Sequence, residues 1–440
     1  MGLIEVFGDF IAFGCGKNIL IYNNRNSETH MLDVSEVNEK LEINEKNTGS
    51  NDEDKLHTYK SCETQLVSVR ASPDGQYLAV ACEKKVVTVW STETWKLHCS
   101  HSLVKRPVAI AITSDSGTLL VADKSGDVYH FPLKGVTSEN ELPHLPYQKN
   151  SREERTEKWD DTKEKPLMGH ISMLLDLTVT EDIRYIITCD RDEKIRVSHY
   201  PNSYNIEAFC LGHQEFVTQV SLLSKSNQLI LSCSGDGTLR LWNYLKGLCV
   251  ACIDTREQTT SLLHHYEKYM QQRINESEEA RRYLPDYPAV MSFSLHSSCS
   301  EDILVAALLH RIPAVLLYKI KGTEVEHIST VELEAEPQVV AWSQSGELIV
   351  QHEDNEQPLC MFKLLNGKVQ QVAGHDLVSL GRKHKHLFTE GQSWLNLDIL
   401  YKQRYDNVAD YMKKKEERLA MEKAAKDGLI PPYKKGRWSK

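Results

Sequence analysis

The sequence predicts an all-β protein, a β-propeller of seven blades in which each blade is a four-stranded sheet. The first observation is a pattern that recurs about forty residues apart, at residues 169–198 and 212–243, where a Gly-His pair precedes a polar turn and a strand. The second is a series of five further stretches in which short apolar strands alternate with turns. Because one such sheet cannot bury both of its faces, the repeats are expected to stack into a ring.

The first three units occupy the N-terminal part of the chain. Residues 3–7 and 11–22 predict two short strands, and the polar stretch at 24–60, rich in Asn and Glu, predicts a mobile loop. In the second unit, Ser72-Pro73-Asp74-Gly75 forms a turn between strands, since Pro sets one φ angle and Gly accepts a positive one. The other strands of these units are expected at 66–69, 77–81, 86–90, 108–113, 119–122 and 127–131, before a charged loop near 137–165.

The pair of repeats at 169–243 supplies the fourth and fifth units, and less regular strand patterns between 290 and 364 supply the last two. Between them, residues 254–284 follow a helical period, which predicts a helical insertion between blades. The propeller is therefore expected to occupy residues 1–400. Residues 401–440 are expected to form a basic C-terminal helix and tail, because apolar residues there share one helix face and the other faces are charged.

Charge and cysteine content narrow the class of protein. The chain has a formal net charge of −10, yet residues 401–440 carry a net charge of +6, so an acidic body bears a basic tail. Eleven cysteines without framework spacing, and a start without the regions of a signal peptide, predict reduced thiols in a cytosolic or nuclear protein. The apolar runs are too short to span a bilayer, which predicts no membrane role.

Several polar side chains in the two repeats resemble a hydrolase constellation but predict a structural network. A buried polar side chain needs a hydrogen-bond partner, and a blade can use its histidine, serine, turn aspartate and tryptophan to lock adjacent strands. In the fourth unit the equivalent residues are His170, Thr188 and Asp192, with Ser198 at the tryptophan position. In the fifth unit they are His213, Ser234, Asp236 and Trp242.

The remaining motifs predict neither catalysis nor a metal site in this chain. Cys249 and Cys252 form the one C-x-x-C pair, but residues three apart on a strand point to opposite faces. The pair is therefore not expected to share a metal or a disulfide, and core cysteines are expected. No second cysteine pair accompanies them. The Pro-Pro-Tyr run at 431–433 matches a box of amino-group methyltransferases, but it lies outside the context in which that box occurs, and no cofactor site is expected.

Residues 165–176 and 187–198 carry a more specific resemblance. The run Arg-Asp-Glu-Lys-Ile-Arg-Val-Ser at 191–198, with residues 206–217, 234–242, 406–408 and 413–419, resembles the non-catalytic WD-repeat subunit of the eukaryotic tRNA (guanine-N7)-methyltransferase. Members of that family form a heterodimer with a catalytic subunit that binds S-adenosylmethionine and methylates tRNA. The resemblance thus implies a chain without a cofactor that holds the catalytic subunit and helps to seat tRNA, in the nucleus and possibly also the cytoplasm.

The same resemblance suggests where the contacts lie. It implies a subunit contact at the turn of the fourth unit, through Asp192, Glu193, Lys194 and Arg196, and ion pairs there would favour correct register. The basic helix has two interpretations, a solvated surface or a contact with the tRNA backbone. The residues of this second site are Lys413, Lys414, Lys415 and Arg418.

Two rival functions remain open at this stage. A general WD-repeat scaffold, such as a substrate adaptor of a ubiquitin ligase, would use the top of the ring and have partners unrelated to RNA. An enzyme comes third, with the Pro-Pro-Tyr run at 431–433 as its one support.

Overall fold

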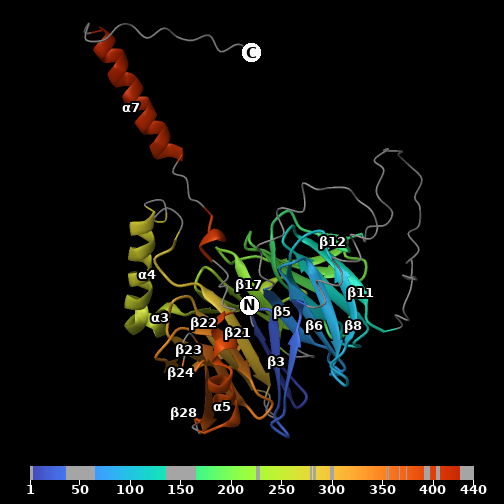
Figure 1. Ribbon diagram of the computed structural model, residues 1–440. Coiled ribbons are helices and arrows are strands. Elements are labelled where there is room, and N and C mark those ends of the chain that lie inside the picture. Colours follow the sequence, from blue (N-terminus) through green and yellow to red (C-terminus); the bar gives the residue numbers. More distant parts are fainter. Residues whose placement is uncertain are drawn as a thin grey trace, which may run out of the picture.

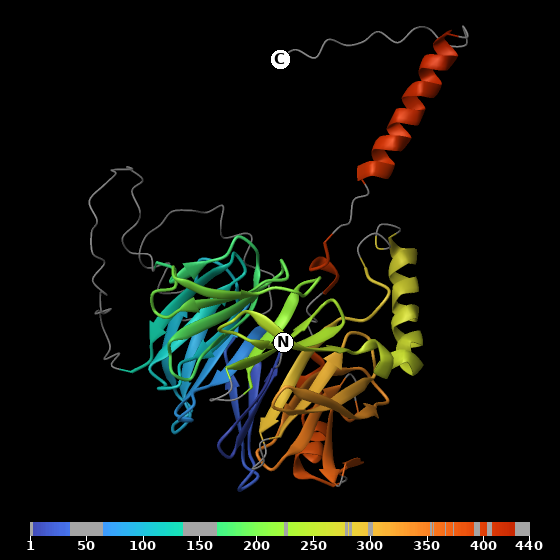
Figure 2. The same ribbon diagram turned by 180° about the vertical axis from the view of Figure 1, so that it is seen from behind.

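The computed structural model contains seven four-stranded antiparallel sheets arranged around one axis, which confirms the predicted seven-bladed propeller (Figure 1). Seen from behind, the sheets again form a ring of blades (Figure 2). The structure describes these residues: 3–35, 65–134, 165–223, 228–277, 280, 284–297, 302–352, 354, 356–365, 367–372, 374–390, 397–402 and 407–426.

The first four blades are built from strands that follow one another in the chain. The first contains β1 (Ile4–Phe7), β2 (Phe10–Cys15), β3 (Asn18–Asn23) and β4 (Thr29–Asp33). The second contains β5 (Leu66–Ala71), β6 (Tyr77–Cys82), β7 (Val86–Ser91) and β8 (Leu97–Ser102). The third contains β9 (Pro107–Ile112), β10 (Thr118–Asp123), β11 (Asp127–Pro132) and β12 (Met168–Gly169), and the fourth β13 (Leu174–Val179), β14 (Tyr185–Asp190), β15 (Ile195–His199) and β16 (Ile206–Cys210).

The last three blades follow the same order. The fifth contains β17 (Val217–Leu222), β18 (Leu229–Ser234), β19 (Thr238–Asn243) and β20 (Leu248–Asp254). The sixth contains β21 (Val290–Ser297), β22 (Ile303–Leu309), β23 (Ala314–Lys321) and β24 (Glu324–Glu332). The seventh contains β25 (Pro337–Trp342), β26 (Glu347–His352), β27 (Leu359–Leu365) and β28 (Lys368–Gln371).

The first blade corrects two predictions. Residues 3–23 form three strands rather than two, because tight turns at Gly8 and Gly16, both with positive φ, divide the stretch. The expected mobile loop at 24–60 is wrong for Thr29–Asp33, which is strand β4 paired with β3. This strand is at the outer edge of its blade and buries only Leu32 completely, so its composition is too polar to predict a strand. Residues 36–60 of that predicted loop, and residues 137–164 of the second one, lie outside the described residues.

The ring closes by side-chain packing. Each of the seven sheets is formed from strands consecutive in the chain, so the first and last blades do not exchange a strand. Instead, their apolar side chains share one core cluster with α5 (Asp376–Lys383) and α6 (Lys385–Glu390). Phe13 of β2 meets Phe388 of α6 edge to face, with ring centroids 5.8 Å apart. Burial of apolar surface between the chain ends therefore provides the closure that strand exchange would provide.

The helical insertion predicted near 254–284 is present between the fifth and sixth blades. It comprises α3 (Arg256–Thr259), the 3-10 turn η1 (Thr260–Leu262) and α4 (Leu263–Glu276), and it buries Tyr266 against the core. After the seventh blade come η3 (Leu397–Ile399) and α7 (Asn407–Lys426), the predicted basic helix, which stands apart from the ring (Figure 1). No helix in the described part of the chain is long and apolar enough to cross a membrane.

Candidate functional site

The fifth blade contains a buried chain of hydrogen bonds that explains its repeat signature. Trp242 Nε1 donates to Ser232 Oγ at 2.8 Å, and the same hydroxyl lies 2.8 Å from His213 Nε2. His213 Nδ1 lies 2.9 Å from Asp236 Oδ2. Because an indole N–H only donates and a carboxylate only accepts, we assign the proton to Nδ1 of the histidine, so that Ser232 donates to Nε2.

One residue of this network differs from the prediction. The serine that bonds to the histidine is Ser232, whereas Ser234, two residues later, donates to the Glu215 carbonyl and accepts from the Asp236 amide. Both serines are fully buried on strand β18. The sequence showed a serine beside the turn but not which one the histidine reaches, because that depends on where the segment before β17 places the imidazole.

The charges of the network suit a structural role. Burial lowers the pKa of His213, which keeps its imidazole neutral. Burial alone would raise the pKa of Asp236, but hydrogen bonds from His213, Thr238 and the Gln214 amide outweigh it and lower this pKa to about 2. Every member of the set is buried, so no substrate reaches a reacting atom, and the arrangement locks strands rather than performing hydrolysis.

The fourth blade repeats the network with its carboxylate in a different position, which corrects the prediction for Asp192. His170 Nε2 lies 2.8 Å from Thr188 Oγ1, but His170 Nδ1 lies 3.2 Å from Asp190, not Asp192. Asp190 also accepts the Asp192 and Lys194 amides at 2.8 and 3.1 Å. Moving the buried carboxylate two residues earlier leaves Asp192 at the surface, with 38% of its side chain exposed.

The four residues of the predicted subunit contact divide into two groups. Arg196 is used inside the propeller: it donates to Ser198 Oγ at 2.8 Å and Ser203 O at 2.9 Å in its own blade, and to Gly169 O of the third blade at 3.1 Å. Its guanidinium thus braces the position at which the fifth blade has Trp242. In contrast, Lys194 is exposed, and the carboxylates of Asp192 and Glu193 lie on the rim of the turn.

A segment that the sequence did not single out lies against this turn. Lys402 Nζ lies 3.2 Å from Asp192 Oδ1 and 2.5 Å from Glu193 Oε1. Arg191 Nε donates to the Leu400 carbonyl at 2.9 Å. The turn of the fourth blade therefore holds the part of the chain that leads from the propeller to α7.

Tyr401 fixes this segment to the fifth blade. Its ring is almost completely buried and meets Phe216 edge to face at 4.8 Å, and its hydroxyl donates to the Gly235 carbonyl at 3.4 Å. From the other side, Asp398 accepts hydrogen bonds from Tyr269 and Arg273 of α4, at 2.7 Å each. The partners of this anchor are more than a hundred residues away in the chain.

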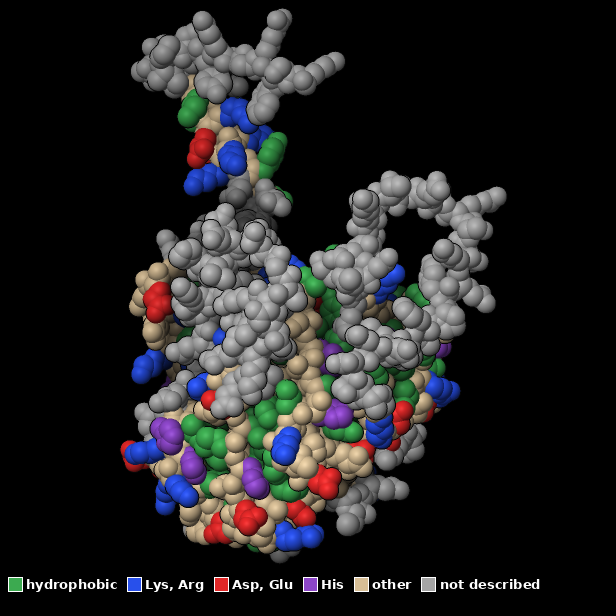
Figure 3. All heavy atoms as spheres, turned by 45° about the vertical axis from the view of Figure 1, so that its right-hand side comes forward, with side chains coloured by type: hydrophobic (Ala, Val, Ile, Leu, Met, Phe, Trp, Pro, Cys, Tyr) green, Lys and Arg blue, Asp and Glu red, His purple; other side chains and the backbone are tan. Residues whose placement is uncertain are grey.

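Helix α7 presents basic and apolar side chains to solvent. Lys413, Lys414, Lys415 and Arg418, the predicted tRNA contact, are all exposed. Large apolar side chains on the same helix are exposed as well, among them Met412 at 44% and Leu419 at 55%. In Figure 3 basic side chains gather on this helix, whereas the visible face of the ring mixes acidic, basic, histidine and apolar side chains.

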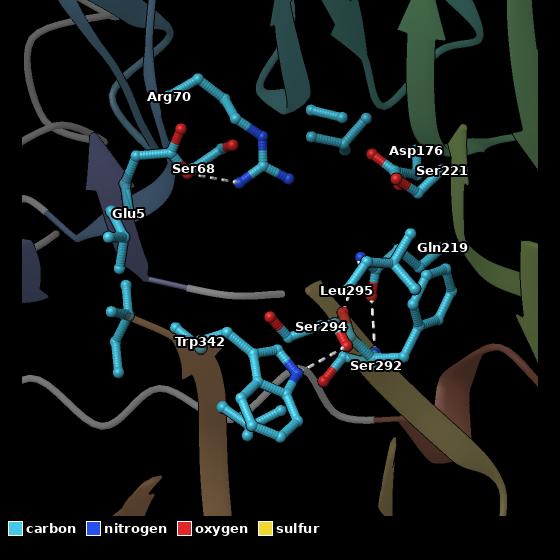
Figure 4. Close-up of a pocket in the computed structure, with 17 residues that line it drawn as sticks. Glu5, Ser68, Arg70, Asp176, Gln219, Ser221, Ser292, Ser294, Leu295 and Trp342 are labelled. Atoms are coloured by element: carbon cyan, nitrogen blue, oxygen red, sulfur yellow. Dashed lines mark hydrogen bonds and ion pairs between the residues drawn. The ribbon is translucent and has the colours of Figure 1, made fainter. Parts of the chain in front are cut away.

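The centre of the ring contains a polar cavity of about 260 Å³, lined by the innermost strands (Figure 4). Arg70 and Glu5 form an ion pair at 3.4 Å across two blades, and burial raises the pKa of Asp176 to about 6. Gln219 bonds to both the amide and the carbonyl of Phe293, at 2.9 and 3.1 Å. These polar side chains connect neighbouring blades, which accounts for their presence in the cavity.

Nothing in the described structure forms a metal site. No group of three or more His, Cys, Asp or Glu side chains among those residues is placed to hold an ion. Cys249 and Cys252, expected in the core, are both exposed on β20, so that prediction is wrong. The outermost strand of this blade lies at the periphery, where side chains remain in contact with solvent.

Comparison with known proteins decides the family. The family model for the tRNA methyltransferase TRM82 WD40 domain matches residues 22–149 and 134–371. The chain belongs to this family. The non-catalytic subunit of tRNA (guanine-N(7)-)-methyltransferase from Xenopus laevis is 31% identical, with 83% of each chain covered. The subunits of that name from Danio rerio and Homo sapiens are 28% and 31% identical, covering 99% and 78% of this chain and 97% and 74% of their own lengths.

The family assignment supports a non-catalytic role in tRNA guanine-N7 methylation, as the sequence predicted. Among solved structures, a chain of a mitotic checkpoint complex has a TM-score of 0.54 at 14% identity, covering 80% of this chain and 87% of its own. The Cps50 (Swd1) β-propeller domain of Myceliophteria thermophila has a TM-score of 0.53 at 12% identity, covering 80% and 93%. At such identities these two structures support the propeller fold alone.

Proposed function

We propose that this chain docks and stabilises the S-adenosylmethionine-dependent catalytic subunit of a tRNA (guanine-N7)-methyltransferase and helps to seat tRNA. The subunit contact would involve the turn of the fourth blade, with Asp192, Glu193 and Lys194 facing the partner. Arg196 would act indirectly, by stabilising strand β15, which follows the turn. The chain itself contributes no reacting group.

The observation that carries this proposal is the pair of ion contacts from Lys402 to Asp192 and Glu193. Lys402 precedes the start of α7 by only five positions, so the contacts tie the root of the basic helix to the turn. A partner seated on the turn would therefore lie beside the helix that we assign to tRNA. One side of the propeller would then serve both docking events.

Charge supports the two assignments in different ways. The turn places two carboxylates and two lysines, Lys194 and Lys402, close together, a mixed arrangement that favours one register of docking over others. Helix α7 instead exposes a run of cations, which suits phosphate groups and carries no sequence information. The subunit contact should thus be specific and the RNA contact general.

The subunit contact is tested by reversing one exposed charge, Lys194→Glu. Lys246→Glu is the matched control, because Lys246 is exposed in the turn after β19, at the opposite end of the neighbouring blade. We expect the first variant to co-purify less with the catalytic subunit and to support less methylation of unmodified tRNA, and the control to behave as wild type. Unchanged association and methylation in Lys194→Glu would reject the site.

The RNA contact is tested by replacing Lys413, Lys414 and Lys415 with Glu in the assembled complex. We expect weaker tRNA binding with a smaller dependence on salt, because fewer counterions are released when fewer phosphates are neutralised. Co-purification of the two subunits should persist. Equal tRNA affinity at every salt concentration would instead favour a solvated helix.

A general scaffold or ubiquitin-ligase adaptor predicts that methylation of tRNA does not depend on this chain at all. Omitting the chain from a reconstituted reaction separates the two functions.

We extend the proposal to the location of the protein in the nucleus, with the cytoplasm as a second location, on the basis of the family and the basic tail. Imaging of the tagged chain tests this location.

A further inference from the structure

A β-bulge lies in the outermost strand of the fifth blade. In the ladder between β19 and β20, Leu241 pairs with Ala251 and the next residue, Trp242, pairs with Cys249. One step on β19 is thus matched by two on β20, and Val250 is the extra residue. Such an insertion reverses the alternation of side chains along the strand that contains it.

The bulge brings Cys249 and Cys252 to one face of the blade. Cys249 is opposite Trp242, and Cys252 is opposite Arg240. Residues opposite each other in a ladder share a face, and so do residues two apart on one strand. Both thiols therefore lie on the face that carries Trp242 and Arg240, whereas a regular strand would have separated them.

The glycine at the start of the fifth unit confirms the direction of this face. A Cβ atom on Gly212 would lie 2.8 Å from Arg240 Nη1 and 3.2 Å from Trp242 Cη2. Both side chains therefore extend toward the segment that joins the fourth and fifth blades. The two cysteines occupy the outer part of the same face.

Spacing and exposure allow the two thiols to react with each other. Cys249 and Cys252 lie opposite Trp242 and Arg240, which are two residues apart on β19. Two residues along a strand span about 6.6–6.8 Å, at the upper limit of the Cα separations found in disulfides. Cys249 and Cys252 are exposed, whereas the other cysteines in the described ranges are buried or half-buried. A reagent in solution can therefore reach this pair in preference to the others.

The surroundings of Cys249 contain a cation. Burial raises the pKa of the Cys249 thiol, but the nearby Arg240 guanidinium opposes this effect by attracting and hydrogen-bonding the sulfur. A negative charge on Cys252 would raise the same pKa, so the two sulfurs are close enough to interact. Arg240 would stabilise whichever thiolate forms beside it.

We propose that Cys249 and Cys252 form a redox-reversible thiol pair that closes to an intramolecular disulfide by exchange with a small-molecule disulfide such as oxidised glutathione. One thiolate attacks a sulfur of the reagent, forms a mixed disulfide and releases the first glutathione thiolate. The second cysteine thiolate then attacks the protein sulfur of that bond and releases the second glutathione thiolate. The two thiols lose two electrons and two protons, and the reagent is reduced to two thiols.

The chain offers a direct assay for this reaction. Trypsin cuts after Lys246 and Arg256, so residues 247–256 form one peptide that contains these two cysteines and no other. The folded full-length chain, with Cys62 and Cys299 replaced by Ser, is equilibrated with oxidised glutathione, alkylated under denaturing conditions and digested. We expect this peptide to resist alkylation and to be lighter than its reduced form by two hydrogen atoms, and a dithiol reductant to restore both alkylation sites.

Variants distinguish a thiol pair from two separate thiols. Cys249→Ser and Cys252→Ser should each accumulate a glutathione adduct at the remaining cysteine. The double change Cys252→Ser with Ile253→Cys keeps two thiols in the peptide but places the second opposite Leu239, on the other face, so it should form no disulfide while folded. Thermal unfolding identifies whether this last variant is folded, and if it is not, the single serine variants decide.

Four results would overturn the proposal. The first is a wild-type peptide with two glutathione adducts, and the second is a peptide that remains fully open to alkylation. A disulfide between Cys249 and Cys210 would assign the reactivity to another pair. Equal disulfide formation in the folded Ile253→Cys variant would show that the bulge does not control the reaction.

Discussion

Replacing Arg196 with Met should destabilise the free chain by about 2 kcal/mol. The change removes three hydrogen bonds, and two of the acceptors belong to the buried residues Ser198 and Ser203. An unpaired buried polar group costs about 1–3 kcal/mol, whereas the exposed Gly169 carbonyl regains water. Met retains much of the apolar stem and avoids burying a charge, which offsets part of the loss.

The assay compares this variant with Lys194→Met in the same turn. Lys194 is exposed, so its loss should change the free energy of unfolding by less than about 0.5 kcal/mol. Urea unfolding, followed by tryptophan fluorescence, should show a lower midpoint for Arg196→Met with an unchanged slope. At temperatures where both variants are folded, Lys194→Met should show the weaker co-purification with the catalytic subunit.

Arg196→Met and Lys194→Met should not behave alike. Equal midpoints for Arg196→Met and wild type would show that the three hydrogen bonds add no net stability. A loss of association confined to Arg196→Met would place the subunit contact on the guanidinium that we assign to the interior of the blade.

Three further predictions follow from other parts of the molecule. Burial lowers the pKa of His310 from 6.5 to about 4, so the unfolded chain takes up the proton first as pH falls. The free energy of unfolding should therefore be about 2 kcal/mol lower at about pH 5 than at neutral pH. His310→Phe should reduce this dependence of stability on pH. Gly235→Ala places a Cβ atom 2.6 Å from the Phe216 ring and should lower the melting temperature, whereas an unchanged value would mean that the ring moves aside at little cost. Tyr269→Phe removes the hydroxyl that donates to Asp398 at 2.7 Å and should cost about 1 kcal/mol, detected as faster amide exchange in α4; unchanged exchange would contradict the anchor.

Much of the fold was predictable because propeller blades repeat a local pattern. Turns such as Ser72-Pro73-Asp74-Gly75 and alternating strands are encoded in short stretches, and the helical insertion shows its own period. Strand β4 was missed because it is an outer-edge strand that buries a single leucine. A strand is recognised in a sequence by the alternating apolar residues of its buried face. An edge strand exposed to water buries few side chains and therefore shows little of this alternation.

The sequence singled out the turn of the candidate site but did not predict the contacts that this turn makes. The sequence drew attention to the turn at 190–196 through its unusual charges, and the structure keeps Lys194 exposed there. Yet His170 contacts the carboxylate of Asp190, whereas an alignment of the two repeats predicts Asp192 as its partner. A shift of two residues preserves the face of a strand, so pattern alone does not detect it.

The sequence by itself determined the seven blades, the insertion, the acidic body with a basic tail and the family, because each is written in local spacing, composition or motif. Only the tertiary structure decided that Arg196 connects its own blade to the third, that Lys402 joins the turn to the root of α7, and that a bulge at Val250 turns two cysteines to one face. These features depend on contacts between residues far apart in the chain or on the register between strands. Long-range contacts and strand register leave no periodic signal in the sequence, because they are decided by packing once the blades have assembled.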